Sequence, residues 1–471
     1  MGSTVSLTIG GAFNGLTGVV TVPSSLLFGA TSVASSLNSQ IQSYLGGISG
    51  LLTTGGINFQ NNDLATSVSG TQAATVSGAG SFEEFTNVSP TSVGGTTAGS
   101  GSYSASITAG VTDLVVQTPG NVTLTGGAPD ASTIVFGANS NVNYSVTNPV
   151  AGTIYLAGGA NSVTLFSTTV DNAETIYSAG TDTVNLEGQG TDYVTILGNG
   201  TVQDFSANAY VTSEGNATTN LYWDNANAGG TLHFTNNSSV AATINIGVFA
   251  NGATSSTKVT AYGGAGGGFY VGGASGGNSL VGGTGAVTLV GAGSGDFLEA
   301  NSSSTNVLAQ GAGPETLVAS STTGANVFGA GLQYPGLGNP AATGLISTDG
   351  SGAQTFFLGN VPGGETIYGS TASTASNTYF IVSGTVQGSV VGGGLYSIYN
   401  FTSSNSNIFL SNGSGGAGSA SITGASVDQF DSTQYDIHLS DGTTIELKGL
   451  TSSEISAIHT YQAGSITGIG G

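Results

Sequence analysis

The chain has 471 residues, and only 6% of them are charged, against roughly a quarter in ordinary soluble domains. Two lysines, no arginine and 24 acidic residues leave a formal net charge of -22. This balance excludes nucleic acid and anionic membrane surfaces as partners, because both need clustered basic side chains. The 81 glycines indicate turn-rich all-β structure, and the absence of cysteine excludes thiolate chemistry.

Residues 1–60 differ from the rest of the chain. Residues 5–11 and 18–23 alternate like strands, and residues 35–52 carry apolar side chains at helical spacing. We interpret the segment either as a cap over the open end of a β stack or as an assembly segment that docks on a neighbouring molecule. It lacks the basic and apolar regions of a cleaved secretory signal. The chain has no apolar run long enough to span a bilayer, so we expect no membrane insertion.

Residues 61–127 are rich in Ser, Thr and Gly and are predicted to be β structure, in a solenoid or in a separate sandwich. From residue 128 onward, repeated phrases place a polar residue two positions before an aliphatic one. Because residues two apart on a strand share a face, stacked coils would align the polar members in ladders. The clearest pairs are Asn161 with Val163, Glu174 with Ile176, Asp182 with Val184, and Asp192 with Val194.

Residues 263–329 contain the most regular repeat. The phrases GGAGGGFYV, GASGGNSLV, GGTGAVTLV and GAGSGDFLE each combine a glycine-rich turn with a short extended piece. Their eighth positions are apolar: Tyr270, Leu280, Leu289 and Leu298. A period this short is typical of stacked coils. We therefore predict an all-β fold, a parallel β-solenoid of the β-roll or β-helix type over residues 128–427, with short helices near the N-terminus and at the C-terminus.

Residues 428–471 change character again. Two alternating strands are predicted to meet at Ser440, Asp441 and Gly442, where Asp-Gly suits a tight hairpin. Thr451 and Glu454 then form the pattern of a capping box at the start of a short helix.

The nonapeptide phrases resemble those of the repeats-in-toxin family of secreted bacterial proteins, whose pattern is GGxGxDxUx with U a large apolar residue. GGTGAVTLV has every glycine but carries Val287 in place of the acid, whereas GAGSGDFLE keeps the acid as Asp296. The resemblance implies export by type I machinery that reads an uncleaved C-terminal signal, here within 428–471. The composition is also similar to S-layer and adhesin-like surface proteins of alphaproteobacteria. We therefore expect an extracellular or cell-surface location.

The resemblance also implies calcium, bound between acids and turn carbonyls of neighbouring coils. Because the sixth positions are Asn, Val, Asp, Asn, Glu and Asn in succession, we expect neighbouring coils seldom to present two carboxylates to one ion. We predict few calcium sites or none. Asp296 is the first candidate ligand, and Asp182 with Asp192 is the candidate pair; the alternative is that these side chains are solvated or hydrogen-bonded.

Three classes of function compete. An enzyme is not expected, because Asp436 and His438 lack a nucleophile motif beside them and basic residues are nearly missing. A glycan-binding adhesin would use Tyr222 and Trp223 as its contact surface, toward polysaccharide or a cell surface. A building block fits better, because the ends of a solenoid carry unpaired backbone groups that pair with another chain. The sequence thus predicts a secreted protein that assembles with itself into a filament, biofilm matrix fibre or S-layer.

Overall fold

The protein is almost entirely β structure, organised as two compact units, Met1–His233 (unit 1) and Phe234–Gly471 (unit 2). The computed structural model describes residues 4–10, 17–23, 62–67, 73–75, 80–86, 102–106, 113–116, 120–125, 133–136, 140–147, 152–156, 158–167, 173–204, 208–223, 230–245, 257–311, 313–320, 323–330, 344–359, 363–382, 384–386, 389–391, 393–411, 420–463 and 466–470. The predicted helix at 35–52 lies outside these residues. Among the described helices, none has the length and apolar character needed to cross a membrane.

Unit 1 is built from two parallel sheets, because alternate strands of the chain enter alternate sheets. The odd sheet contains β3 (Asn62–Ser67), β5 (Gly80–Thr86), β7 (Asp113–Val116), β9 (Thr133–Phe136), β11 (Thr153–Leu156), β13 (Thr175–Ser178), β15 (Thr191–Ile196) and β17 (Asn208–Ser213). The even sheet contains β4 (Ala73–Thr75), β6 (Ser102–Ser106), β8 (Gly120–Thr125), β10 (Ser140–Thr147), β12 (Ser162–Ser167), β14 (Thr181–Gly188), β16 (Asn199–Asp204) and β18 (Thr218–Trp223). The described strands within 61–127 therefore belong to the solenoid. A further pair, β1 (Thr4–Gly10) and β2 (Thr17–Pro23), forms a separate antiparallel sheet.

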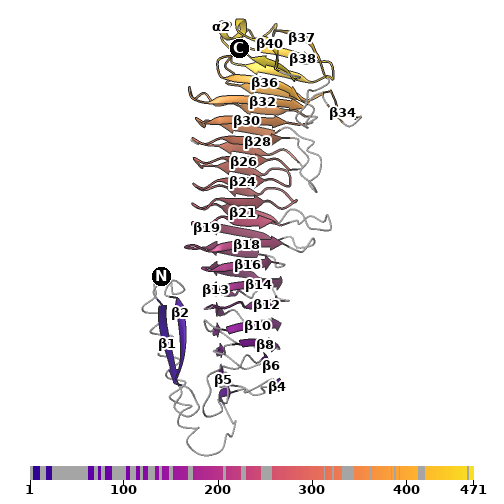
Figure 1. Ribbon diagram of the computed structural model, residues 1–471. Helices are drawn as coiled ribbons and strands as arrows, with labels where there is room; N and C mark the ends of the chain where they lie inside the picture. The colour runs from indigo at the N-terminus through magenta and orange to yellow at the C-terminus, as the bar shows by residue number, and fades with distance from the viewer. Residues whose placement is uncertain are drawn as a thin grey trace, which may run out of the picture. The chain divides into compact units, whose positions relative to one another are not determined.

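Unit 2 repeats the two-sheet plan (Figure 1). Its odd sheet contains β21 (Lys258–Tyr262), β23 (Ser279–Val281), β25 (Phe297–Ala300), β27 (Thr316–Ala319), β29 (Gly344–Thr348), β31 (Glu365–Tyr368) and β35 (Leu395–Tyr399). Its even sheet contains β20 (Ala242–Asn245), β22 (Gly268–Val271), β24 (Val287–Val290), β26 (Asn306–Ala309), β28 (Asn326–Ala330), β30 (Ala353–Leu358), β32 (Ser376–Val382) and β36 (Ser406–Ser411). β19 (Thr231–Asn236) spans the division between the units, and β33 (Gly384–Val386) pairs with β34 (Ser389–Val391) as a small hairpin. The predicted parallel β-solenoid is confirmed.

The core of unit 2 consists of stacked side chains from the predicted apolar positions. Tyr270, Leu280, Leu289 and Leu298 are all fully buried. Leu280 pairs with Leu298 in the odd sheet, whereas Tyr270 pairs with Leu289 in the even sheet. One nonapeptide phrase therefore makes one side of a coil, and two phrases make the whole turn. The glycines permit close coil spacing: Gly267 has φ of 72° and lies directly against the Ala286 backbone of the next coil.

Antiparallel strands close the parallel sheets of unit 2 at the C-terminal end. β39 (Thr444–Lys448) joins β35 in parallel and pairs with β38 (Tyr435–Leu439), which pairs in turn with β37 (Ile422–Val427). In the even sheet, β36 pairs with β41 (Ile466–Gly470), and β41 pairs with β40 (His459–Ala463). We call the segment from β37 to β41 the C-terminal cap.

The two local predictions for the C-terminal cap are confirmed. Gly442 has φ of 85° between β38 and β39, as the predicted Asp-Gly turn requires. Helix α2 (Ser452–Ser456) begins with a capping box, in which the Thr451 hydroxyl accepts the Glu454 N–H. The Thr451 N–H donates in return to the Glu454 carboxylate at 2.7 Å.

Candidate functional site

Asp296, the first candidate metal ligand, lies at the start of β25 with 1% of its surface exposed. Its Oδ1 accepts two hydrogen bonds from Asn278 on the neighbouring coil, from the backbone N–H and from Nδ2, both at 2.8 Å. Its Oδ2 accepts the N–H groups of Ala292 and Gly293 in its own turn, at 2.9 and 3.2 Å. The carboxylate thus ties one coil to the next and closes its own turn.

Asp182 on β14 repeats this arrangement in unit 1. Its Oδ1 accepts the backbone N–H and the Nδ2 of Asn161 at 3.0 and 2.8 Å. Its Oδ2 accepts the Ser178 hydroxyl at 2.7 Å and the Gly180 N–H at 3.1 Å. Burial raises the pKa of Asp182, and these donors offset part of the rise. Asp182 and Asp296 make the same kinds of hydrogen bond because both lie where a glycine-containing turn meets a strand.

Asp182 and Asp192, the predicted candidate pair, lie in different sheets. Asp182 lies on β14 in the even sheet, whereas Asp192 lies on β15 in the odd sheet. The strand neighbour of Asp192 is Glu174, whose N–H donates to the Asp192 Oδ1 at 3.3 Å. The ten-residue spacing that suggested a pair carries the chain from one sheet to the other, so the two residues are not neighbours within a sheet.

Coil length decides which acids are neighbours in a sheet. Because each coil spans two phrases, every second phrase stacks, and Asn278, Asp296 and Glu315 follow one another in the odd sheet. Burial raises the pKa of Glu315 well above its usual range; Asp296 and Glu365 raise it further, and the Gly311 N–H partly offsets the rise. Both units therefore contain stacked carboxylates inside the fold.

The equivalent pair in unit 1 is Glu174 and Asp192. Burial, with a further contribution from Asp192, raises the pKa of Glu174 to about 8, although the Gly152 N–H opposes the rise. The only two lysines of the chain, Lys258 and Lys448, both belong to unit 2, so unit 1 contains no lysine or arginine. Lys448 lies in the C-terminal cap, where it pairs with Glu446 at 2.9 Å. Protons rather than basic side chains are therefore the means of neutralising Glu174.

We call the stacked acids Asp296 and Glu315 of the odd sheet, together with Glu365, the acidic column of unit 2. Gln310 lies beside Glu365. Both are buried, and the space around Gly344 brings the Gln310 Nε2 close to the Glu365 Oε2. Burial raises the pKa of Glu365 to about 8, with the Gln310 amide and the Gly344 N–H opposing the rise. Both Glu365 oxygens and both Gln310 amide atoms lack a hydrogen bond of normal geometry. Gln310 follows β26 and does not precede an aliphatic residue by two positions, so the repeated phrases do not single it out.

The even sheet of unit 2 carries an uncharged column in place of the acids. The Asn306 Nδ2 donates to the Asn326 Oδ1 at 2.9 Å, and the Asn326 Nδ2 donates to the Gln354 Oε1 at 2.8 Å. All three side chains are fully buried. The predicted amide ladder is confirmed, and it lies on the sheet opposite to the acidic column.

The donors around these acids bear on the calcium prediction. Every hydrogen bond that Asp296 makes comes from an N–H group, which favours a structural carboxylate over a cation ligand. Within the residues that the structure describes, no three His, Asp or Glu side chains are grouped so as to hold a metal ion. Calcium binding remains a prediction from the repeats.

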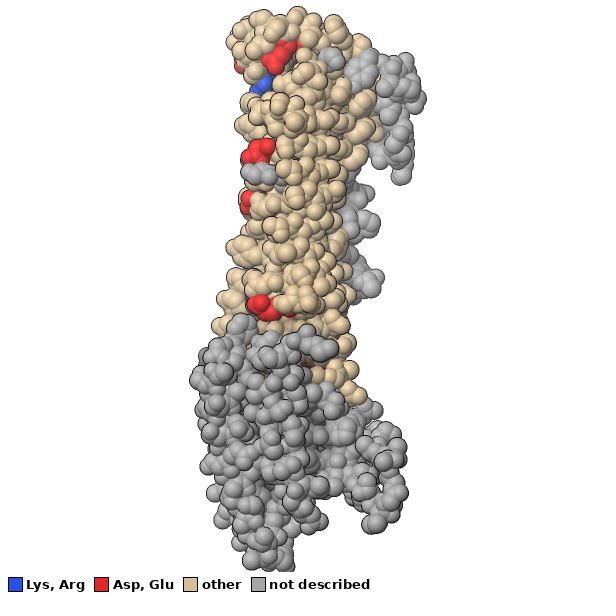
Figure 2. Space-filling model, turned by 60° about the vertical axis from the view of Figure 1, so that its left-hand side comes forward, with Lys and Arg blue, Asp and Glu red and all other residues tan. Residues whose placement is uncertain are grey.

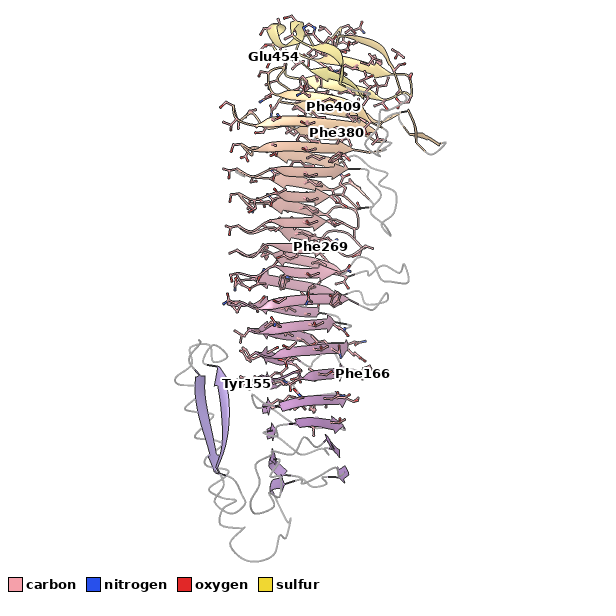
Figure 3. The ribbon with its side chains drawn as sticks, in the orientation of Figure 1. Tyr155, Phe166, Phe269, Phe380, Phe409 and Glu454 are labelled. Atoms are coloured by element: carbon pink, nitrogen blue, oxygen red, sulfur yellow. The ribbon has the colours of Figure 1, made fainter. Side chains whose placement is uncertain are left out.

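The outer faces of the sheets carry stacked aromatic rings. In unit 1, Tyr193 stacks on Tyr210 with ring centroids 5.1 Å apart, and Tyr210 stacks on His233 at 4.5 Å. In unit 2, Phe380 on β32 stacks on Phe409 on β36 at 5.3 Å (Figure 3). Because each ring covers the face of the next, the stacks join successive coils and expose ring edges to solvent.

The predicted glycan contacts and histidines lie apart from the buried columns. Tyr222 is 41% exposed on β18. Trp223 ends the same strand, and its side chain lies outside the described part of the chain. On β38, the His438 Nδ1 lies 3.3 Å from the Thr444 hydroxyl at an exposed position.

The chain was compared with protein-family models, with curated proteins and with solved structures. None of the three comparisons finds a match. The resemblance to the repeats-in-toxin family thus rests on the nonapeptide phrases, while the solenoid rests on the observed strand pairing.

Proposed function

We propose that this protein is a secreted structural protein whose copies assemble into an extracellular filament, matrix fibre or S-layer. The observation that carries the proposal is the scarcity of charge on the outer faces of the coils. Six acids are buried inside the two units: Glu174, Asp182, Asp192, Asp296, Glu315 and Glu365. Figure 2 presents a face of unit 2 on which few acidic or basic side chains reach the surface.

The even sheet of unit 1 illustrates this scarcity, since Glu187 is the one outward acid among its side chains of described burial. One outward column across β10, β12, β14, β16 and β18 contains only amides and hydroxyls: Asn143, Ser162, Thr183, Thr201 and Asn220. Uncharged columns of this kind let two copies approach with less repulsion than a surface that carried its share of the 24 acids. Burying acids while leaving hydroxyls outside therefore supports lateral packing of like molecules.

The extracellular part of the proposal rests on the nonapeptide phrases. Their similarity to the repeats-in-toxin pattern supports type I export through a signal within the C-terminal cap. Fusing residues 428–471 to a reporter in a bacterium with type I machinery tests this step. Secretion of the fusion supports the proposal, whereas retention inside the cell contradicts the export step.

Electron microscopy of the purified full chain tests the assembly. We expect ordered filaments or sheets that persist when a chelator is added, because the contacts proposed are between neutral faces. Particles that stay monomeric at every calcium concentration and pH would contradict self-assembly. Polymers that dissolve in chelator would instead show that a metal ion holds the contacts.

A polysaccharide-binding adhesin is a second candidate, and Tyr222 is the observation that favours it. This ring is 41% exposed beside the column of amides and hydroxyls described above, which suits hydrogen bonding to sugars. Retention of the protein on a polysaccharide column, lost in Tyr222→Ala but kept in the control Tyr193→Ala, would support this function. Equal retention of both variants would contradict a role for Tyr222.

A further inference from the structure

Strand β37 is at least partly exposed along its whole length. Among the described strands it pairs only with β38, so no described strand lies along its second edge, which we call its open edge. None of its residues is buried, and Val427 at its end is 42% exposed. Its sequence, ITGASV, lacks the lysine or proline that usually keeps an edge strand from pairing with another chain. The register shift between Ile422 and Gly424 affects only its start.

Phe430 follows this open strand and is 87% exposed. The turn that carries it is held by hydrogen bonds: the Asp428 carboxylate accepts the N–H groups of Phe430 and Asp431, at 2.7 and 2.8 Å. The Asp428 N–H donates in turn to the Gln434 carbonyl at 3.0 Å. A large aromatic ring held outward in a fixed turn has the character of an interface anchor.

The charge around β37 restricts what can bind there. Lys448 is the one basic residue between β37 and α2, against six acids: Asp428, Asp431, Asp436, Asp441, Glu446 and Glu454. An acidic partner surface would be repelled. The first 62 residues of the chain contain no charged side chain, because Asp63 is the first acid and Lys258 the first base. This segment is therefore suited to approach the acidic cap.

The hairpin β1–β2 lies within this uncharged segment and requires a further strand or a covering surface for stability. It is a two-stranded sheet, and such a sheet is marginal in water without a third strand or a covering surface. Its register pairs Val5 with Val22 and Leu7 with Val20. The edge of β37 offers this two-stranded sheet the third strand that it lacks among the described residues.

We propose that the β1–β2 hairpin of one molecule docks on the open edge of β37 and against Phe430 of a second copy, joining the molecules head to tail. This inference rests on the proposed self-assembly and specifies which parts meet. The contact is heterologous, because two different surfaces meet. A series of bound copies therefore ends in one free hairpin and one free cap, and further copies can add at either end. Backbone pairing supplies the edge contact, and Phe430 supplies the anchor.

Mixing two full-length variants tests the proposal. Phe430→Ser disables the cap and Leu7→Asp disables the hairpin, so each variant alone should stay monomeric by analytical ultracentrifugation. A one-to-one mixture should form dimers and nothing larger, because one intact hairpin then meets one intact cap. Tyr262→Ser, at a tyrosine 50% exposed on β21, is the control and should polymerise like the wild type.

The outcomes separate this inference from the proposed function. If the wild-type protein forms no polymer, self-assembly itself fails. If the wild type polymerises and Phe430→Ser polymerises equally well, or if the mixture stays monomeric, head-to-tail docking through these elements is wrong. We expect Phe430→Ser to weaken association on the order of tenfold or more, as loss of an anchor does.

Engineered cysteines locate the contact, since the chain has none of its own. Ser6→Cys or Thr8→Cys on β1 is mixed with Ser426→Cys on β37, and each is a single-cysteine full chain. Oxidation should give a disulfide-linked dimer that joins the two different variants. A double variant that carries Ser6→Cys and Ser426→Cys in one chain is the comparison. If only this double variant is linked, and as a monomer, the hairpin folds back on its own cap and the proposal is overturned.

Discussion

Asp296 and Asn278 are joined by two hydrogen bonds to a single oxygen. The Asp296 Oδ1 accepts both the backbone N–H and the Nδ2 of Asn278, each at 2.8 Å, across two neighbouring coils. Asp182 and Asn161 make the same two bonds in unit 1. Asp296 and Asp182, both predicted as candidate metal ligands, thus make the same structural link between neighbouring coils.

Asp296→Ala should strongly destabilise the protein. The substitution leaves the Asn278 amide and the N–H groups of Asn278, Ala292 and Gly293 without their acceptor inside the fold. Unsatisfied buried donors each cost about 1–3 kcal/mol, so we expect a loss of at least about 3 kcal/mol. Urea unfolding measures it, with Glu299→Ala on the outer face of β25 as the control. A change no larger than that of the control would contradict the structural role of Asp296.

Stability should fall as the pH rises from about 4.5 to about 8. The pKa of Glu365 is raised from 4.5 to about 8, so between these values the folded state holds a proton that the unfolded state releases. The stabilisation is therefore fully present below the unfolded pKa and is lost as the pH passes through the folded one. Glu174, whose pKa is also raised to about 8, should likewise lower the stability as the pH rises.

Glu365→Gln isolates this effect, because the amide resembles the protonated acid. Thermal unfolding followed by circular dichroism should show a smaller loss of Tm between pH 5 and pH 9 in Glu365→Gln than in the wild type. Glu299→Gln is the matched control and should keep the wild-type slope. If Glu365→Gln keeps that slope as well, the buried carboxylate does not set the pH dependence.

Gly291 and Glu315 should be energetically coupled. A Cβ at Gly291 would collide with the Glu315 carboxylate, which lies over the glycine. Gly291→Ala should therefore destabilise the wild type by roughly 1–3 kcal/mol but cost much less in a Glu315→Ala background. Gly424→Ala is the control, because its nearest neighbour, the His438 Cδ2, would lie 3.8 Å away. Additive costs in the double variant would rule out this contact.

Thr451→Ala should remove the capping box of α2 and cost about 1 kcal/mol. The Glu454 N–H would lose its acceptor, the Thr451 hydroxyl. Thr451→Ser retains a hydroxyl and should recover most of the stability. Hydrogen exchange of the Glu454 amide provides a local measurement, and unchanged protection in Thr451→Ala would speak against the cap.

The sequence by itself determined the elements that depend on neighbouring residues. Alternation and glycine turns predicted the solenoid, the apolar positions predicted buried Leu280 and Leu298, and the Asp-Gly dipeptide and the Thr451–Glu454 spacing predicted the hairpin and the helix start. The prediction that polar residues would stack in ladders is confirmed for Asn326 and its neighbours. Each of these features follows from local geometry with a period of two or from a single turn.

The tertiary structure alone decided which residues meet. Coil length cannot be read from the phrase, because one phrase may fill a whole coil or one side of it; here it fills one side. That choice separated Asp182 from Asp192 onto different sheets and placed Glu315 next to Asp296. The open edge of β37 is likewise a tertiary feature, because an edge exists only where no neighbouring strand pairs, and no local sequence pattern shows this.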